Sequence, residues 1–460
     1  MAVPSWSIGR TVPFDLVRIL ASDAAAAVGG RLIGPDVEFD GASFDSRSTQ
    51  PGELFVPIVA ERDGHDFIDQ ARAAGAVAHL TSRPFDSGDG GTAIEVADTS
   101  DALMTLAQWA RRRSTARVVG VTGSVGKTST KDFIAAACDA TRRTTANVRS
   151  YNNEQGLPVT ILNAPDDTEV LVLEMGMRGF GEITRLCDVA RPDIGVVTAV
   201  GHSHTERVGG IDGVAVAKRE LVQALPTSGT AVLNADDERV MAMAAHTGAS
   251  VITYGRAGDV RVIDLVLDEL ARARFTIDTP WGSGLVELAM SGAHMAMNAA
   301  GAIAAAGALG VPLDAAVAGV STASVSAMRM QVTTLPNGAT LINDAYNANP
   351  TSMAAALDAL AAMRATRRVA VLGLMAELDD PVAAHREIAS LVARAGIELI
   401  AVGTDRYGVE PSTDPIADLG DLGPGDVVLV KASRAAGLDR IADDLATFAS
   451  RFPRTGPRKS

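Results

Sequence analysis

Residues 116–137 read ARVVGVTGSVGKTSTKDFIAAA, and this stretch predicts the fold of the central part of the chain. The apolar run at its start predicts a buried β-strand, and the alanine-rich run at its end predicts a helix. Between them, Gly123 and Gly126 allow a tight turn whose backbone N–H groups point at an anion. The N-terminus of the following helix adds its partial positive charge. The stretch therefore predicts a strand–loop–helix unit that holds phosphate groups.

Two side chains of this loop carry the predicted chemistry. Lys127 would reach the terminal phosphates, and Thr128 would offer its hydroxyl to Mg²⁺. The strict pattern G-x-x-x-x-G-K-[ST] needs a glycine at position 121, where this chain has Val121, so the loop is a shorter G-x-x-G-K-T variant. An ordinary strand–turn–helix corner is the alternative. The loop alone does not distinguish a kinase, a GTPase and a ligase.

The rest of the chain predicts an α/β protein with three domains. Strand-like runs at 170–176, 193–201, 230–237 and 251–255 alternate with helices, which indicates a mostly parallel sheet with helices on both faces. Residues 260–290 alternate like a small antiparallel patch, and a second, smaller α/β rhythm begins near 328. We expect domains at 1–113, 114–325 and 326–460, in keeping with a prior of ~100–200 residues per domain.

Composition excludes several classes of protein. Hydrophobic residues make up 47% of the 460 residues, which predicts a soluble globular chain with ample core. Aromatic residues are only 4% and the formal net charge is −14, which argues against base stacking and duplex DNA binding. The two cysteines, Cys138 and Cys187, give no disulfide framework and fit a reducing cytosol. With no apolar signal core in MAVPSWSIGRTVP and no run long enough for a membrane span, we expect a cytoplasmic protein.

Carboxylates and histidines follow the predicted central strands, at the edge where open α/β sheets build their sites. Glu174 ends one strand, while His202, His204 and Glu206 follow another. Glu174, His204 and a third anionic ligand could hold a divalent ion, since oxygen ligands suit Mg²⁺. Each of these residues taken singly could equally be a solvated loop residue.

Seven motifs then follow one another along the chain: TGSVGKTSTK (122–131), YNNEQGLPVTIL (151–162), LEMGMRGFGEI (173–183), VGHSHTERVGGIDGVAVAKREL (200–221), MRMQ (328–331), INDAYNANPTSM (342–353) and VLGLMAELDD (371–380). Together they resemble the Mur ligases, from about residue 41 to 440, and within them the branch that adds D-alanyl-D-alanine. No D-N-P occurs in the chain, whereas the diaminopimelate-adding branch carries a D-N-P-R motif. The resemblance implies a UDP-substrate-binding domain, a central ATP-binding domain with a phosphate loop and a C-terminal Rossmann-like ligase domain.

The resemblance also implies which residues bind ATP and metal. Asn298 would read adenine, Arg329 would contact the phosphates and Asp344 would bind the ribose. Lys218 matches a lysine that family members carry as a carbamate; without the resemblance it would be a surface helix lysine. The implied ATP-binding set is Gly123, Ser124, Gly126, Lys127, Thr128, Ser129, Asn298, Arg329 and Asp344. The implied metal set, for two Mg²⁺ ions, is Thr128, Glu174, His204 and Lys218, and the implied catalytic set is Lys127, His204 and Lys218.

On the substrate side, the stretch 44–68 and the motifs around 152 and 347 resemble family binding segments. Ser46, Arg47, Asp63 and His65 would lie near the uridine diphosphate. Asn152 and Asn153 would contact the muramoyl peptide, and Tyr346, Asn347 and Asn349 would shape the acceptor side. Three positions depart from the family pattern, namely Val125, Ala199 and Thr205.

The implied reaction joins a carboxylate to an amine in peptidoglycan precursor synthesis. ATP would phosphorylate the terminal carboxylate of UDP-MurNAc-tripeptide, and the amine of D-alanyl-D-alanine would attack the acyl phosphate. The alternatives are a Mur-type ligase that adds a different amino acid, a small-molecule kinase and a non-catalytic nucleotide-binding paralogue. We expect a monomer with no nucleic-acid partner and no membrane span.

Overall fold

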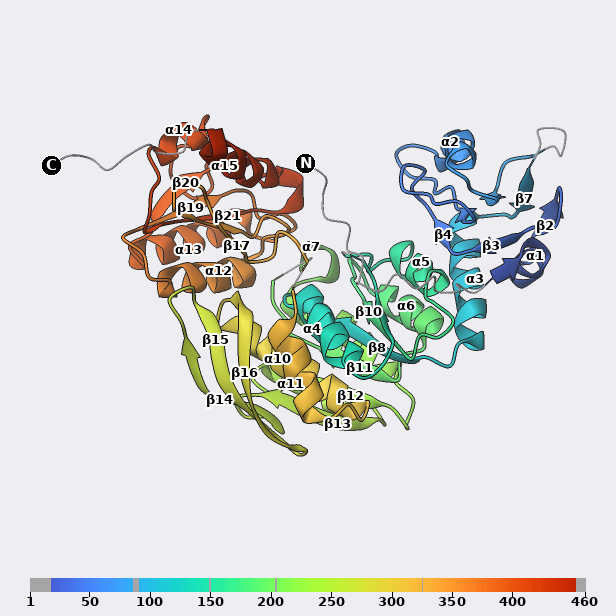
Figure 1. Cartoon of the computed structure of the whole chain (residues 1–460), viewed down its shortest axis with the longest axis horizontal. Coiled ribbons are helices and arrows are strands. Elements are labelled where there is room, and N and C mark those ends of the chain that lie inside the picture. Colours follow the sequence, from blue (N-terminus) through green and yellow to red (C-terminus); the bar gives the residue numbers. More distant parts are fainter. Residues whose placement is uncertain (1–17, 86–90, 149, 203–204, 325, 452–460) are drawn as a thin grey trace. The chain divides into compact units, whose positions relative to one another are not determined.

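The computed structural model describes residues 18–85, 91–148, 150–202, 205–324 and 326–451 (Figure 1). The chain divides into two compact units. Unit 1 comprises Met1–Ala116 with Glu154–Leu171, and unit 2 comprises Arg117–Asn153 with Val172–Ser460. Each unit is described by itself.

Unit 1 is built on a five-stranded sheet in the order β2-β7-β6-β5-β4. Its strands are β2 (Arg31–Ile33), β4 (Ala42–Ser43), β5 (Leu54–Phe55), β6 (Ala78–Thr81) and β7 (Thr92–Glu95), with only β2 antiparallel to its neighbour. A second, antiparallel pair joins β1 (Arg18–Leu20) to β3 (Glu38–Asp40). The helices of unit 1 are α1 (Ala21–Val28), α2 (Ile68–Ala73), α3 (Thr99–Arg113) and α5 (Gly156–Leu162), with the 3₁₀ helix η1 (Gly64–Phe67).

The local sequence explains where α3 begins and ends. Asp98 accepts hydrogen bonds from the N–H groups of Ser100 and Asp101, so it caps the helix N-terminus. Three arginines occupy the last turn, where positive charge complements the helix dipole. The buried side chains of α3, including Leu103 and Leu106, recur at helical spacing.

Within the described residues, unit 2 contains a nine-stranded sheet in the order β16-β15-β14-β13-β12-β11-β8-β10-β9. The strands are β8 (Arg117–Thr122), β9 (Thr144–Ala146), β10 (Val170–Glu174), β11 (Ile194–Val197), β12 (Thr230–Asn234), β13 (Ser250–Gly255), β14 (Val260–Leu267), β15 (Arg272–Thr279) and β16 (Gly282–Ser291). The run from β8 through β11, β12 and β13 to β14 is parallel, and β14, β15 and β16 are antiparallel. The predicted antiparallel patch at 260–290 is therefore confirmed.

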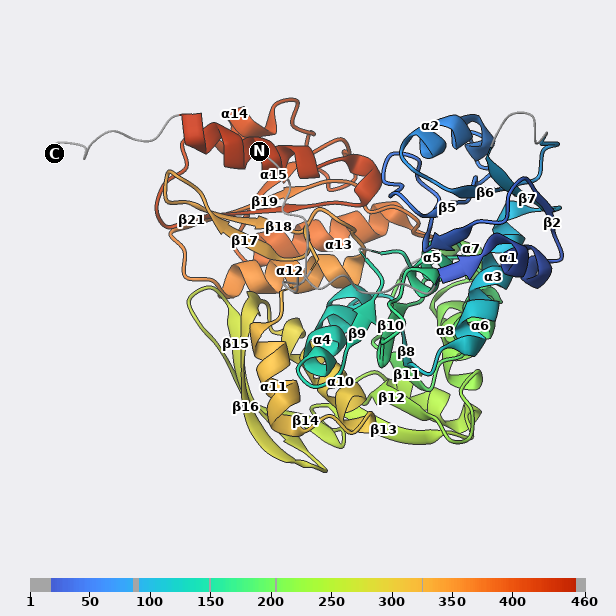
Figure 2. The same ribbon diagram turned by 45° about the vertical axis from the view of Figure 1, so that its right-hand side comes forward.

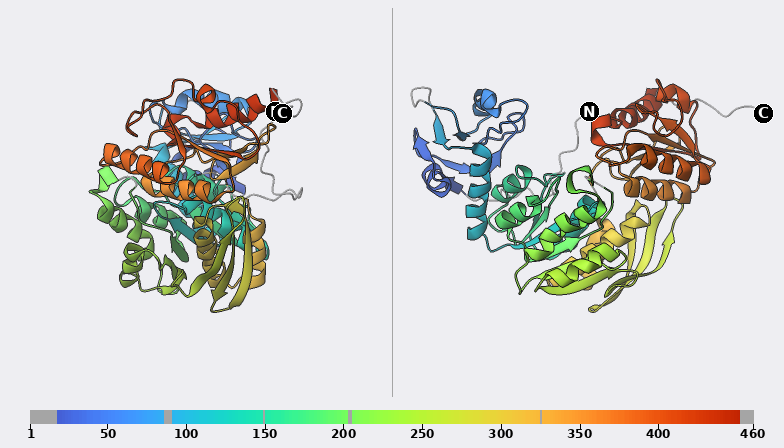
Figure 3. Two further views of the ribbon diagram at one scale, coloured as in Figure 1. Left: turned by 90° about the vertical axis from the view of Figure 1, so that its left-hand side faces the viewer. Right: turned by 180° about the vertical axis from the view of Figure 1, so that it is seen from behind.

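Helices cover both faces of this sheet. Helices α4 (Lys127–Asp139), α10 (His294–Ala308) and α11 (Leu313–Thr322) lie side by side on one face, as Figures 1 and 2 show. Helices α6 (Glu182–Ala190) and α8 (Ile211–Gln223) pack on the other face, which the right-hand view of Figure 3 shows in green. The two remaining helices in this stretch, α7 (Thr205–Val208) and α9 (Glu238–Met241), are short. Small residues permit the close packing, because a Cβ on Gly319 would lie 2.3 Å from the carbonyl oxygen of Ala136. Cys138 and Cys187 are buried in α4 and α6.

The C-terminal part of unit 2 has its own five-stranded sheet, in the order β17-β18-β21-β19-β20. The strands are β17 (Gln331–Thr334), β18 (Thr340–Asn343), β19 (Arg367–Leu372), β20 (Glu398–Ala401) and β21 (Asp426–Lys431), and only β17 is antiparallel. The helices are α12 (Pro350–Ala362), α13 (Pro381–Arg394), α14 (Pro415–Leu419) and α15 (Asp439–Arg451). The first three begin alike, with an Asn or Asp cap followed by proline, because proline fits the first helical position.

These sheets confirm the predicted α/β class with a mostly parallel central sheet. The residue limits predicted for the three domains stay a prediction. No helix in the described part of the chain is long and apolar enough to cross a membrane.

Candidate functional site

The predicted phosphate loop lies between β8 and α4 in unit 2. Two of its glycines are required by the geometry. Gly126 has a φ of 82°, which favours glycine, and a Cβ on Gly123 would lie 1.8 Å from the hydroxyl oxygen of Thr198. The loop is thus packed tightly against the segment that follows β11.

Hydrogen bonds fix the loop to this neighbouring segment. The N–H of Ser124 donates to the carbonyl of Ala199 over 2.8 Å, and the Ser124 hydroxyl donates to the carbonyl of Gly201 over 3.0 Å. The Thr198 hydroxyl donates to the carbonyl of Val125. Val125 and Ala199 are two of the departures from the family pattern, and both bind through backbone atoms. Their side chains are therefore replaceable without loss of these contacts.

Lys127 and Thr128 begin α4 and lie at the loop. The ammonium of Lys127 donates to the carbonyl of Gly123 over 2.6 Å. Desolvation lowers the pKa of Lys127, Arg329 acts in the same direction and Glu174 opposes them. The Thr128 hydroxyl donates to Oε2 of Glu174 over 2.6 Å, while Ser129 is buried in the same helical turn. Two predicted metal-binding residues from distant parts of the sequence are therefore in contact.

Glu174 ends β10 and is held from three sides. Its side chain is buried, and Oε1 accepts a hydrogen bond from the Asn152 amide over 2.7 Å. Its backbone N–H donates to Oδ1 of Asn147 over 2.9 Å. Asn147 also donates through Nδ2 to the carbonyl of Tyr151, and its own carbonyl accepts from Lys131 over 2.7 Å. These contacts connect α4, β9 and β10 around one carboxylate.

Lys131 and Asn147 are not among the site residues predicted from the sequence. Lys131 lies four residues after Lys127 on α4, so helical spacing could have indicated a shared face. Asn147 offered no comparable signal, because its partners are distant in sequence. Asn153 is exposed.

Lys218 is buried on α8, so the surface reading of this lysine is wrong. No acidic side chain in the described part of the chain pairs with it. Desolvation lowers its pKa well below the usual value, and Lys127 acts in the same direction. Glu220, two residues on, points elsewhere: its carboxylate accepts hydrogen bonds from the backbone of Gly181 and Thr184 at the start of α6.

His204 lies outside the described residues, and His202 is exposed. Within the described ranges, no three His, Cys, Asp or Glu side chains gather as a metal cluster.

The hydroxyl of Thr205 is buried and makes no hydrogen bond to the described residues. Nothing in the structure accounts for threonine at that position.

Asn298, Arg329 and Asp344 come from three further elements. Asn298 lies on α10, and its Oδ1 is 2.6 Å from where a Cβ on Gly126 would stand, so it lies directly against the loop. Arg329 precedes β17 and donates to the Ser150 hydroxyl over 3.1 Å. Asp344 follows β18 and accepts a hydrogen bond from Lys431, which ends β21 and was not predicted.

The predicted acceptor residues differ in their contacts. Asn349 is buried and its side chain accepts the N–H of Ser352, so it caps α12. Asn347 is exposed, and its carbonyl accepts from Lys431. The ring of Tyr346 lies beneath the Arg329 guanidinium, 4.3 Å from its central carbon. Asn349 is thus engaged structurally, whereas the side chains of the other two are at least partly open.

In unit 1, the predicted UDP residues form two clusters. The Ser46 hydroxyl donates to Gln70 over 3.0 Å, and Arg47 donates two hydrogen bonds to Asp45 from its guanidinium and one from its backbone N–H. Asp63 accepts hydrogen bonds from the His65 N–H and from Arg83, a residue the sequence analysis missed, and its carboxylate contacts the His65 ring. Hydrogen bonds from the backbone and ring of His65, with Arg83, lower the pKa of Asp63 to about 2. The second cluster is therefore a charged, ordered turn.

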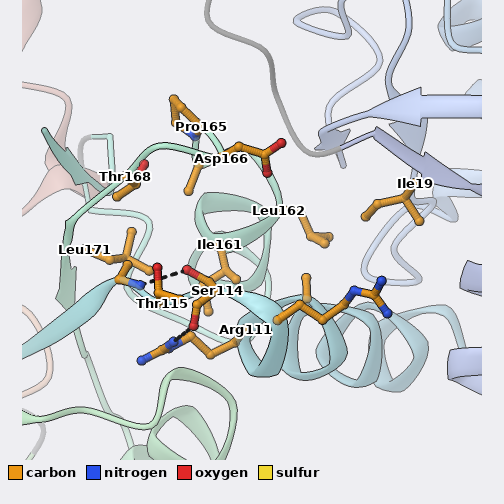
Figure 4. Close-up of a pocket in the computed structure, with 14 residues that line it drawn as sticks. Ile19, Arg111, Ser114, Thr115, Ile161, Leu162, Pro165, Asp166, Thr168 and Leu171 are labelled. Atoms are coloured by element: carbon orange, nitrogen blue, oxygen red, sulfur yellow. Dashed lines mark hydrogen bonds between the residues drawn. The ribbon is translucent and has the colours of Figure 1, made fainter.

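Unit 1 also contains a cavity of about 260 Å³ between the end of α3 and the segment 161–171 (Figure 4). Arg111 lines it and donates to the carbonyl of Ser114. None of the predicted site residues lines this cavity.

Comparisons with known proteins match most of the chain. The family model described as Mur ligase middle domain matches residues 121–306, and that described as Mur ligase, glutamate ligase domain matches 328–434. A UDP-N-acetylmuramoyl-tripeptide--D-alanyl-D-alanine ligase from Mycobacterium bovis is 40% identical, over 87% of this chain and 91% of the relative. A crystal structure of MurF from Acinetobacter baumannii superposes with a TM-score of 0.85 at 27% identity, covering 95% of this chain and 100% of that one. MurF ligase from Thermotoga maritima, in complex with ADP, gives a TM-score of 0.78 at 27% identity, covering 89% and 98%.

Proposed function

The chain belongs to the Mur ligase family, and we infer that it is an ATP-dependent ligase that adds D-alanyl-D-alanine to UDP-MurNAc-tripeptide. The relatives that match nearly its whole length carry this activity in their names, and one such structure holds ADP. The observation that carries the inference is the contact between Thr128, on the phosphate-loop helix, and Glu174, at a strand end. The product is a peptidoglycan precursor.

The residues around the loop fit ATP and Mg²⁺. We propose that the loop from Gly123 to Ser129 and the N-terminus of α4 bind the phosphates, and that Lys127 neutralises charge on the transferring group. Asn298, which lies against Gly126, is proposed to bind adenine. The Thr128 hydroxyl and the Glu174 carboxylate are the oxygen donors that Mg²⁺ prefers, and His204 is proposed for a second ion. Bound Mg²⁺ would neutralise negative charge on the phosphates.

The reaction uses positioning more than covalent chemistry by the protein. The terminal carboxylate of the tripeptide attacks the γ-phosphorus of ATP, which releases ADP and gives an acyl phosphate. The neutral amine of D-alanyl-D-alanine then attacks the acyl carbon, and the tetrahedral intermediate expels phosphate to leave an amide. The amine loses its proton in this step.

Lys218 is proposed to carry a carbamate. Its burial without an acidic partner in the described residues favours the neutral amine, which is the form that adds to carbon dioxide. The amine nitrogen bonds to the carbon of CO₂ and loses a proton, so a cation becomes an oxygen ligand. This chemistry suits a lysine that lies within electrostatic reach of the phosphate-loop lysine.

The remaining assignments are proposals that rest on family resemblance. Ser46, Arg47, Asp63 and His65 are proposed to bind the uridine diphosphate, Asn152 and Asn153 the muramoyl peptide, and Asn347 and Asn349 the acceptor side. We also propose domains at 1–113, 114–325 and 326–460, a monomer and a cytoplasmic location.

The proposed function is tested by coupled ADP release. UDP-MurNAc-tripeptide and ATP are supplied with D-alanyl-D-alanine, with single D-alanine or with no amine, and the product is weighed by mass spectrometry. We expect ADP release to depend on the dipeptide and the product to gain both alanines. Turnover with a single amino acid alone would place the chain in another branch of the family. Lys127→Ala is the control and is expected to abolish ADP release.

A further inference from the structure

The segment Met328–Arg329–Met330 has an unusual backbone. Both methionines are left-handed, with φ of 60° and 50°, a region that side-chain-bearing residues rarely adopt. The surrounding structure must therefore hold this conformation. Arg329, the residue proposed to contact the phosphates, lies between the two.

Hydrogen bonds with two residues that follow β18 hold the segment on both sides. The N–H of Tyr346 donates to the carbonyl of Met328 over 3.3 Å, and the N–H of Met330 donates to Oδ1 of Asp344 over 3.0 Å. The other oxygen of Asp344 accepts from the buried ammonium of Lys431 over 2.6 Å. Asp344 therefore ties the strained segment to the end of β21, whatever else it binds.

The side chain of Arg329 is fixed by two contacts. Its guanidinium carbon lies 4.3 Å from the centre of the Tyr346 ring, within cation–π range. Its Nη2 donates to the hydroxyl of Ser150 over 3.1 Å. Ser150 is two residues before Asn152, whose amide donates to the Glu174 carboxylate, so Arg329 binds the segment that also holds a proposed metal ligand.

We propose that Tyr346 is a positioning residue for Arg329, and so acts on ATP binding rather than on the acceptor dipeptide. The proposal rests on the proposed function, and it assigns Tyr346 differently from its sequence motif. The phenol hydroxyl of Tyr346 has no hydrogen-bond partner among the described residues, so the ring is the part that acts. A planar guanidinium over a ring loses little freedom when it binds phosphate, because its orientation is already set.

The test compares Tyr346→Leu, which removes the ring, with Tyr346→Phe, which keeps it. We expect Tyr346→Leu to raise the KM for ATP about tenfold and to leave the KM for D-alanyl-D-alanine unchanged. Tyr346→Phe keeps the ring, so its KM for ATP should rise much less than that of Tyr346→Leu. A rise in the dipeptide KM with an unchanged ATP KM would overturn the proposal, as would equal effects of the two variants.

A double-mutant cycle with Arg329→Met tests whether Tyr346 acts through Arg329. Binding of a non-hydrolysable ATP analogue with Mg²⁺ is measured by calorimetry, without any acceptor. Tyr346→Leu should weaken binding about tenfold in the wild type and less than twofold in the Arg329→Met background. Equal losses in both backgrounds would contradict the proposal.

The same measurements separate failure of this inference from failure of the proposed function. If wild-type protein binds the analogue but releases no ADP with D-alanyl-D-alanine, the proposed function fails while the cycle still reports on Tyr346. Circular dichroism verifies folding of each variant. Since Tyr346 is only half-buried, Tyr346→Gln replaces the leucine variant if that one unfolds, with the same expected results.

Discussion

Two buried lysines of unit 2, Lys131 on α4 and Lys218 on α8, show how partners decide the role of a charge. Lys131 is 2% exposed and is satisfied by the Asn147 carbonyl and by Asp132, 2.9 Å away. Lys218 is equally buried, but no acid pairs with it in the described residues. A buried ammonium without a counter-ion is costly, so the folded protein favours the neutral amine. The two residues should respond in opposite ways to the same substitution.

We expect Lys218→Met to keep or raise the thermal stability of protein in bicarbonate-free buffer while abolishing ADP release. The folded pKa of Lys218 is lowered, so the energetic cost is present at neutral pH and fades as the pH rises toward 10.5. Lys131→Met should instead cost about 1–3 kcal/mol, because it leaves buried acceptors unpaired. Thermal denaturation at pH 7 checks both. Equal destabilisation by the two substitutions would contradict this reading of Lys218.

His79 should make the stability of unit 1 sensitive to acid. It is 1% exposed, its Nε2 lacks a partner in the described region, and desolvation lowers its pKa to about 4. Because the unfolded chain takes up the proton near pH 6.5 and the folded unit does not, stability should fall as pH drops from 6.5 to 4, by up to about 3 kcal/mol. His79→Leu should flatten this slope, measured by urea denaturation across that range. A slope unchanged by the substitution would assign the acid sensitivity to other groups.

At the scale of elements, local chemistry made many helices and strands predictable. The apolar run of β8 followed by two glycines predicts the loop, and caps such as Asn349 before Pro350 mark helix starts. The contacts that hold the site are different, because they join elements distant in the sequence. Asn147 reaches Glu174 across 27 residues, and Lys431 reaches Asp344 across 87. No local pattern carries such pairings.

We expect Asn147→Ala to raise the Mg²⁺ concentration needed for half-maximal ADP release by about tenfold, since Glu174 loses the acceptor that fixes its backbone. Asn163→Ala in unit 1 is the matched control. Asn163 likewise bonds a backbone through both side-chain atoms, with the N–H and carbonyl of Ala42, so its loss should lower stability alone. Mg²⁺ titrations of ADP release distinguish the two. If Asn147→Ala leaves the Mg²⁺ concentration for half-maximal ADP release unchanged, Asn147 does not help to position a metal ligand.

At the scale of the whole molecule, the division into units was only partly readable from the sequence. Residues 154–171 lie between two stretches of unit 2 but fold with unit 1. Asn163 bonds Ala42, and α5 packs against α3, so long-range contacts decide where this segment belongs. Sequence texture cannot indicate this, because α5 is an apolar helix that could cover any sheet. The family resemblance predicted the order of the domains along the chain. Only the structure shows that residues 154–171 fold with unit 1.

The proposed ATP-binding loop and the proposed UDP-binding residues lie in different units, so each ligand should slow hydrogen exchange in a different unit. Ligands that bind only the folded state slow local opening around their own site. A non-hydrolysable ATP analogue with Mg²⁺ should slow hydrogen exchange in unit 2, at 118–134 and 172–176. UDP-MurNAc-tripeptide alone should slow exchange in unit 1, at 43–49 and 63–67, where Ser46, Arg47, Asp63 and His65 lie.

Lys127→Ala is the control for this exchange experiment. It should abolish protection by the nucleotide analogue and leave protection by the UDP substrate unchanged, because the loop and the UDP residues belong to separate compact units. Protection of unit 2 alone by the UDP substrate would refute the assignment of Ser46, Arg47, Asp63 and His65 while leaving the nucleotide site intact. Protection of unit 1 by the nucleotide in the Lys127→Ala protein would show that ATP binds away from the loop of residues 123–128.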